Sequence, residues 1–278
     1  MSTAGADLLL RDPRRAIGAG GARLGFAIGI VAMILIAVAP TVAPQDTLST
    51  SAAVLHPPSA AHLLGTDRLG RDVFSRFLAG GRLIEILSIS AGLLAAGLGA
   101  VVGLTSGYVG GVVDLILMRG VDVLLALPPI LLILVVAAVL PRSNVTVVVL
   151  VGVLLAPGAA RVLRGLAQQY AAREFVAAAE AAGARWYEVL AHEIMPNVRG
   201  RLLLEVALRT GFAVVLISSL NFLGLGVSPP APDWGLEINE ARAVVTLAPW
   251  TVLAPALGLA LLVASVNLVA TGMAQARE

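Results

Sequence analysis

The sequence predicts an all-α membrane protein with six transmembrane helices. Of the 278 residues, 58% are hydrophobic and 13% are charged, and the mean hydropathy is +0.93. Soluble domains contain about 25% charged residues, so half of the usual solvating charge is missing. Six apolar stretches without Asp, Glu or Arg are at least 18 residues long, and a spanning helix needs about 20 residues. These stretches are residues 24–45, 86–113, 123–141, 143–160, 210–232 and 243–276.

The first apolar stretch, residues 24–45, has two interpretations. It follows a basic segment, residues 1–23, and the small residues 37–39 resemble a signal-peptidase site. Pro40 would then directly follow the cut, which disfavours processing. The preferred interpretation is therefore a retained transmembrane helix that follows a cytosolic N-terminal segment.

Residues 46–82 form the predicted extracytoplasmic loop. Its uncharged part, residues 47–66, contains Ser, Thr, His and two adjacent prolines, and these polar groups would be unsatisfied in lipid. Asp67 could cap an amphipathic helix that begins near Val73 and lies at the outer interface. We therefore expect a loop with an interfacial helix, followed by a five-helix core at residues 83–278.

The distribution of arginine predicts the orientation. With the N-terminus inside, the inner segments contain 13 Arg and the outer segments contain 6. Inner loops of membrane proteins are enriched in positive charge. We therefore expect a multi-pass protein of the cell membrane with both termini in the cytoplasm, although four of the outer arginines are concentrated in residues 68–82.

A stripe of small residues runs along the second predicted span. Ala95, Gly99, Gly103 and Gly107 recur every four residues and therefore share one helix face. Such a face allows the backbone of another helix to approach closely. Plain helix–helix packing is the preferred interpretation over a ligand groove. Residues 108–111 then predict a turn into the third span.

The third span contains two charges and two prolines that mark a candidate cavity or interface. Arg119 and Asp122 are three residues apart, so they are neighbours on a helix. Within the membrane they would mark a functional site; at the cytosolic interface they would form a structural pair with each other, which is the preferred alternative. Pro128 and Pro129 remove helical hydrogen bonds, which predicts a break that faces a cavity.

Residues 161–209 form the longest predicted cytosolic segment. Residues 173–182 and 185–194 are two short helical patterns, and Gly183 between them suits the left-handed conformation that ends a helix. Pro196 is expected to end the second helix. The small residues at the bend would let the cleft of a partner approach closely. The alternative is a helix pair that lies on the membrane surface.

This segment resembles the coupling loop of binding-protein-dependent ABC importer permeases. That loop has the pattern Glu-Ala-Ala, three residues, Gly, about nine residues and Ile-x-Leu-Pro. Residues 177–179 occupy the Glu-Ala-Ala position, Gly183 is in place, and residues 194–196 close the pattern. The resemblance implies that an ATPase contacts Glu174, Ala177, Ala178, Ala179, Glu180, Gly183, Ala184, Ile194 and Pro196.

The chain departs from the family pattern at the Glu position of this loop. Ala177 stands where the family has Glu. Glu174 and Glu180 lie about one turn to either side, and either could replace it. The bend at Gly183 does not depend on this substitution.

Three further stretches resemble the dipeptide, oligopeptide and nickel permease branch of the family. They are residues 65–76, residues 110–129, and residues 220–235 with 248–250. The position of the first stretch resembles the C-type subunit of the permease pair. Its signature residues are Gly65, Thr66, Asp67, Gly70, Arg71 and Asp72. We expect them to form a structural knot rather than to contact substrate.

The resemblance implies the fold, function and partners of the chain. The fold would be that of a type I ABC importer permease, and the substrate a di- or oligopeptide, with nickel or another small solute as the alternative. The partners would be a homologous permease subunit, one or two ABC ATPase subunits, an extracytoplasmic solute-binding protein and membrane lipid, without nucleic acid. ATP and Mg would be bound by the ATPases, and this chain would be non-catalytic, with no cofactor or metal of its own.

The residues also bear on two other functions, an intramembrane hydrolase and an ion-coupled carrier or channel. The sequence has no Cys and no Lys, which excludes thiolate catalysis and a Walker A loop. An intramembrane hydrolase needs converging catalytic or metal-binding side chains, but His56 and His62 lie in the outer loop and His192 lies in the cytosolic segment. An ion-coupled carrier or channel needs charges inside the spans, and no charge other than Arg119 and Asp122 falls within the predicted spans.

Overall fold

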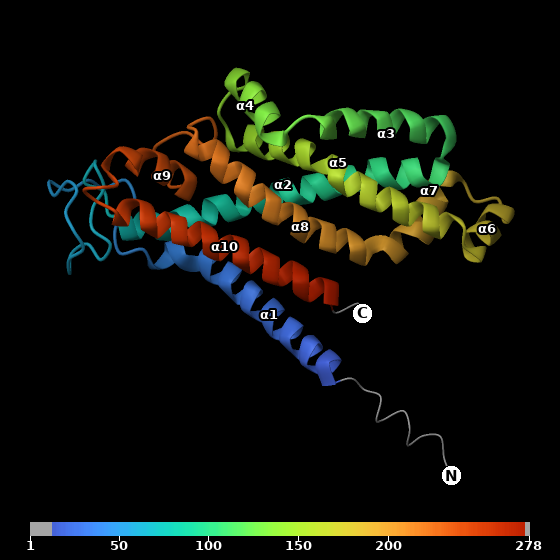
Figure 1. Cartoon of the computed structure of the whole chain (residues 1–278), viewed down its shortest axis with the longest axis horizontal. Coiled ribbons are helices and arrows are strands. Elements are labelled where there is room, and N and C mark those ends of the chain that lie inside the picture. Colours follow the sequence, from blue (N-terminus) through green and yellow to red (C-terminus); the bar gives the residue numbers. More distant parts are fainter. Residues whose placement is uncertain (1–12, 276–278) are drawn as a thin grey trace, which may run out of the picture.

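The computed structural model describes residues 13–275, with side chains from residue 23 onward, and it is nearly all helical (Figure 1). The long helices are α1 (Pro13–Val38), α2 (Val73–Val109), α3 (Gly111–Ala126), α4 (Pro129–Val139), α5 (Asn144–Ala171), α8 (Met195–Phe222) and α10 (Trp250–Gln275). The short ones are η2 (Ala39–Val42), α6 (Glu174–Ala181), α7 (Trp186–Glu188), the π-helical η3 (Val189–Ile194), α9 (Trp234–Ala241) and η4 (Arg242–Val244).

The structure confirms the predicted all-α, six-span architecture. Five helical runs are long and apolar enough to cross a membrane, and α3 with α4 passes the same test as one broken span. The long helices run side by side, and the irregular segments gather at the two ends of the bundle (Figure 1). The loop at residues 43–72 and helix α9 lie at one end, and α6 and α7 lie at the other.

Helix α2 occupies the centre and packs against α5 through the predicted small-residue face. A Cβ on Gly99 would lie 2.5 Å from the Cβ of Ala159, and one on Gly103 would clash with the carbonyl oxygen of Ala160. Ala95 is fully buried. The helix–helix interpretation of this stripe is therefore confirmed, because α5 fills the space that larger side chains would need.

The prediction of a separate interfacial helix is wrong. Residue 73 begins α2 itself, and the helix continues to Val109 without interruption. Asp72, and not Asp67, caps it by accepting a hydrogen bond from the backbone N–H of Ser75. Gly80 and Gly81 do not break the helix; they make room for the ring of Trp234, which a Cβ on Gly81 would approach to 2.5 Å.

The third span is not one straight helix over residues 123–141. It consists of α3 and α4, bent by 89° at Leu127–Pro128, so the predicted break at the prolines is confirmed. Pro128 and Pro129 are both exposed. Their place beside a cavity stays a prediction.

Pro196 does not end the second cytosolic helix, so the prediction that it would is wrong. Helices α7, η3 and α8 form one continuous run from Trp186 to Phe222. In the π-helical turn, the N–H of Met195 bonds to the carbonyl of Leu190, five residues earlier. Pro196 directly follows this turn, where the regular bonding to the fourth preceding carbonyl is already interrupted, so the run continues past a residue without an N–H.

The contact between α2 and α5 predicts a position-specific effect of side-chain size. Gly103→Val should lower the thermal stability of the purified protein by about 1–3 kcal/mol, because the added atoms meet the backbone of α5. Gly97→Val, on the same helix, is the matched control, since a Cβ there has no neighbour within 4 Å. Thermal unfolding followed by Trp fluorescence measures both, and equal melting temperatures would contradict this packing.

Candidate functional site

The bent segment, residues 172–194, lies at one end of the bundle and connects α5 to α8. Helix α6 ends at Ala181, and Gly183 adopts φ +88°. The N–H of Gly183 bonds to the carbonyl of Glu180 at 2.9 Å, and the N–H of Ala184 bonds to Ala179 at 3.1 Å. These bonds satisfy carbonyls at the end of α6 and reverse the chain. The predicted bend at Gly183 is therefore present.

A buried apolar cluster attaches the bent segment to the bundle. Val176, Val189 and Ile194 are each at most 1% exposed, and they pack with Leu163 of α5 and Leu104 of α2. Ile194 therefore holds the segment in place instead of facing a partner. Of the other predicted contact residues, Ala179 and Ala184 are half-buried, and the exposed ones are Glu174, Ala177, Ala178, Glu180, Gly183 and Pro196.

Aromatic side chains add to the exposed surface of the bent segment. Trp186 is 53% exposed, Tyr187 is 45% exposed and Phe175 is 38% exposed. Arg185 is the N-cap of α7, and its backbone N–H bonds to the Glu188 carboxylate at 2.7 Å. This end of the molecule therefore presents a fixed, bent surface of small and aromatic side chains, which is the kind of surface that a protein cleft can enclose.

Ion pairs at the same end connect α3 to α5. Arg164 donates two hydrogen bonds to Asp114, each 2.6 Å long, and Arg161 donates one to Asp122 at 2.6 Å. The predicted pairing of Arg119 with Asp122 is wrong, because α3 lies against α5 and Arg161 reaches the carboxylate from there. Arg119 is exposed. These ion pairs attach α3 to α5. Among the described side chains of α3, only Val121 is buried.

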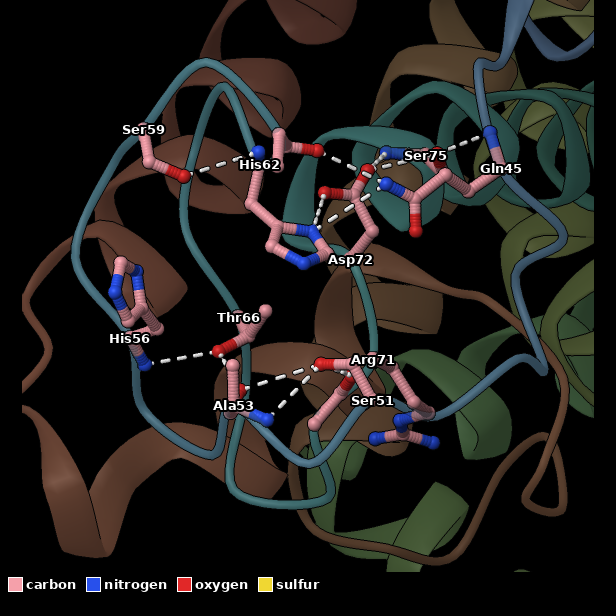
Figure 2. A network of polar contacts seen from close by, with 12 residues as sticks. Gln45, Ser51, Ala53, His56, Ser59, His62, Thr66, Arg71, Asp72 and Ser75 are labelled. Atoms are coloured by element: carbon pink, nitrogen blue, oxygen red, sulfur yellow. Dashed lines mark hydrogen bonds and ion pairs between the residues drawn. The ribbon is translucent and has the colours of Figure 1, made fainter.

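The signature residues form a polar knot at the opposite end of the bundle (Figure 2). Asp72 caps α2 and lies 3.0 Å from His62 Nδ1, and Thr66 Oγ1 accepts the N–H of His56 at 2.8 Å. Gly65 and Gly70 both adopt φ +72°, and a side chain at either would clash with a backbone carbonyl of the same loop.

Two arginines connect this knot to α9. Arg71 donates to Asp67 at 2.6 Å and to Glu240, and Arg76 lies 3.4 Å from Glu237. Both arginines are at most 5% exposed. Two of the four arginines that opposed the predicted orientation are therefore structural, since Arg71 pairs with two carboxylates and Arg76 is buried beside α9.

Comparison with known proteins identifies the family. Residues 99–277 match the family model described as binding-protein-dependent transport system inner membrane component. The chain belongs to this family. The glutathione transport system permease protein GsiD of Pectobacterium atrosepticum is 37% identical over 221 residues, which cover 80% of this chain and 73% of that protein. The dipeptide transport system permease protein DppC of Haemophilus influenzae is 33% identical over 265 residues, covering 93% of this chain and 90% of the other.

The permease has charges within its spanning helices that the apolar stretches did not predict. Glu205 of α8 is 1% exposed and accepts a hydrogen bond from Arg209 at 2.8 Å, with Arg201 at 3.7 Å. Glu85 of α2 is 5% exposed, and its Oε2 has no partner among the described residues. Both helices extend beyond the uncharged stretches, so counting only uncharged residues missed these side chains.

Two buried acids anchor α9 of the permease. Asp233 caps the helix by accepting the N–H of Leu236, and Glu237 lies one turn further on. Burial raises the pKa of Asp233 to about 6 and that of Glu237 to about 8, and for Glu237 the attraction of Arg76 does not offset the burial.

The raised pKa of Glu237 predicts a pH-dependent stability. The unfolded chain loses this proton near the ordinary pKa of 4.5, whereas the folded chain keeps it to about pH 8. The folded state therefore loses stability as the pH rises between these values. Glu237→Gln removes the ionisation, so its melting temperature should fall less than that of the wild type between about pH 5 and about pH 8.

Thermal unfolding across this pH range tests the prediction. Glu174→Gln, at an exposed site on the opposite end of the molecule, is the control and should keep the wild-type slope. A Glu237→Gln slope as steep as that of the wild type would contradict the prediction.

Proposed function

We propose that this permease is the transmembrane subunit of an ATP-driven importer of di- or oligopeptides. The observation that carries the proposal is the bent segment, which is exposed, held by a buried cluster and located at the opposite end from the polar knot. A peptide substrate is supported by the relatives, which are named as dipeptide and glutathione permeases. Glutathione is itself a small peptide.

The proposed partners are assigned to different surfaces of the molecule. One or two ABC ATPases, which bind ATP and Mg, dock on the bent segment, and a solute-binding protein approaches the end that contains the polar knot. A homologous permease and lipid cover the apolar sides. Support for this last assignment comes from α3 and α4, whose exposed apolar residues include Val112, Ile116, Val135 and Val139. The permease itself performs no covalent chemistry in this scheme.

The mechanism follows from how the bent segment joins the spans. It is continuous with α5 on one side and with α8 on the other. A displacement of α6 by a closing ATPase is therefore transmitted directly to two central helices. Rigid-body movement of such helices would alternate access to a path between the two permeases. Both termini are cytoplasmic in this arrangement, since the first turn of α1 and the last turn of α10 point toward the α6 end.

Ion-coupled transport is the second candidate, because Glu85 is a buried carboxylate with an unpartnered oxygen on a spanning helix. Import of nickel or another small solute by an ATP-driven complex is the remaining alternative for the substrate. Uptake of a labelled dipeptide by a deletion strain that carries the gene of this permease separates ATP-driven peptide import from ion coupling. Peptide import requires uptake that is lost when the ATPase is inactivated, whereas ion coupling requires uptake that persists without the ATPase and stops when the ion gradient is dissipated.

Gly183 provides the mutational test of the bent segment. Gly183→Val should reduce uptake by at least about tenfold while membrane insertion remains normal, because a β-branched residue is strained at φ +88° and the bend would change. Gly183→Asn is the matched control, since Asn tolerates this conformation, and it should retain most of the uptake. Uptake assays with immunoblots of the membrane fraction measure both effects. Wild-type uptake by Gly183→Val would refute the docking role.

A further inference from the structure

The chain connects the bent segment to only two of the central helices. Helices α5 and α8 are joined to it through the backbone, but α2 and the broken span α3–α4 are not. The backbone reaches them only indirectly, through residues 140–143 between α4 and the far end of α5. At its own end of the bundle, the bent segment acts on these helices through non-covalent contacts. The apolar cluster supplies one such contact, but apolar surfaces are non-directional.

A single directional contact is present. Tyr108, in the last turn of α2, donates a hydrogen bond from its phenolic O–H to the carboxylate of Glu180 on α6. The two oxygens are 2.6 Å apart. Among the side chains that the structure describes, this is the one hydrogen bond between residues 172–194 and α2, α3 or α4. Hydrogen bonds to an ionised acceptor are about twice as strong as neutral ones.

The position of Glu180 indicates that its carboxylate does not serve α6 itself. It lies in the last turn of an eight-residue helix, where the helix dipole disfavours a negative charge. The bond to Tyr108 gives the carboxylate a partner. The Tyr108 ring packs on the buried cluster, and the two side chains border an open groove together with Thr105, Val109, Val113 and Trp186.

Tyr108 also lies directly before the turn between α2 and α3. Gly110 and Gly111 adopt φ +68° and +55°, and neither would bring a Cβ within 4 Å of another group. Glycine is therefore needed there for the backbone conformation alone. Beyond the turn, Asp114 is held by Arg164 and by the hydroxyl of Ser106. The start of α3 is thus attached to α5 through Arg164 and to α2 through Ser106, while the end of α2 is also attached to α6.

We propose that Tyr108 and Glu180 are positioning residues that transmit movement of α6 to the turn at Gly110–Gly111 and so to the broken span. The proposal rests on the proposed function and names the contact through which the ATPases act on α2 and α3. It assigns Glu180 a role toward its own chain, in addition to any contact with an ATPase.

The test uses the complete complex in proteoliposomes, with peptide uptake and ATP hydrolysis measured together. Tyr108→Phe removes only the hydroxyl and keeps the packed ring. It should lower the peptide transported per ATP hydrolysed by at least about fivefold, with hydrolysis retained. Glu180→Ala should show the same loss, whereas Glu180→Gln keeps an acceptor oxygen and should restore most of the coupling. Tyr170→Phe, on a ring that packs on the same cluster, is the control and should have no effect.

The double variant decides between a shared and a separate role. Tyr108→Phe combined with Glu180→Ala should be no worse than Glu180→Ala alone, because the second substitution finds the shared hydrogen bond already removed. An unchanged ratio in Tyr108→Phe, or losses that multiply in the double variant, would overturn the proposal. If the wild-type complex shows no ATP-driven peptide uptake, the proposed function itself is wrong. Wild-type uptake combined with an unaffected Tyr108→Phe refutes the positioning role alone.

Discussion

The close contact between α2 and α5 is the constraint on which the rest of the structure depends. Without a hydrophobic driving force between helices in lipid, association requires close packing, and the small residues of α2 bring the two backbones together. The parallel contact places the start of the bent segment beside the end of α2. It also places Arg161 and Arg164 of α5 where the acids of α3 can reach them. The contacts at the bent segment therefore follow from a stripe of small side chains.

Charge is distributed to suit the membrane. The ion pairs of Arg71 with Asp67 and Glu240 lie at one end, and the α3–α5 pairs lie at the other. The charges that remain on spanning helices are few, and Glu205 is neutralised by Arg209 within α8. The charged residues have different structural roles at the two ends of the bundle. The knot fixes a loop to the bundle, whereas the pairs near the bent segment hold α3, which has little apolar packing of its own.

Much of this architecture could be predicted from the sequence, because it depends on local patterns. Hydropathy predicted the six spans, proline chemistry predicted the break at Pro128, and the conformational freedom of glycine predicted the bend at Gly183. Predictions failed where tertiary contacts decide. Arg119 and Asp122 satisfy the spacing for a helical pair, but Arg161 of another helix takes the carboxylate. The predicted apolar stretches stop at Glu85 and Arg209, because every charged residue ends such a stretch. The sequence alone does not distinguish a charge that is buried against protein from one that would face lipid. Pro196 continues a helix because a π-helical turn precedes it.

The proposed binding of an ATPase to the bent segment, on the cytosolic side of the membrane, can be tested directly. The chain contains no cysteine, so a single cysteine at the exposed position Ala178 can be cross-linked without background. The account predicts that Ala178→Cys forms a cross-link to the ATPase subunit in membranes and is not labelled by an impermeant thiol reagent applied to intact cells. His56→Cys, in the loop at the opposite end, should show the reverse pattern. Labelling of Ala178→Cys from outside, or no cross-link to any nucleotide-hydrolysing partner, would contradict the account.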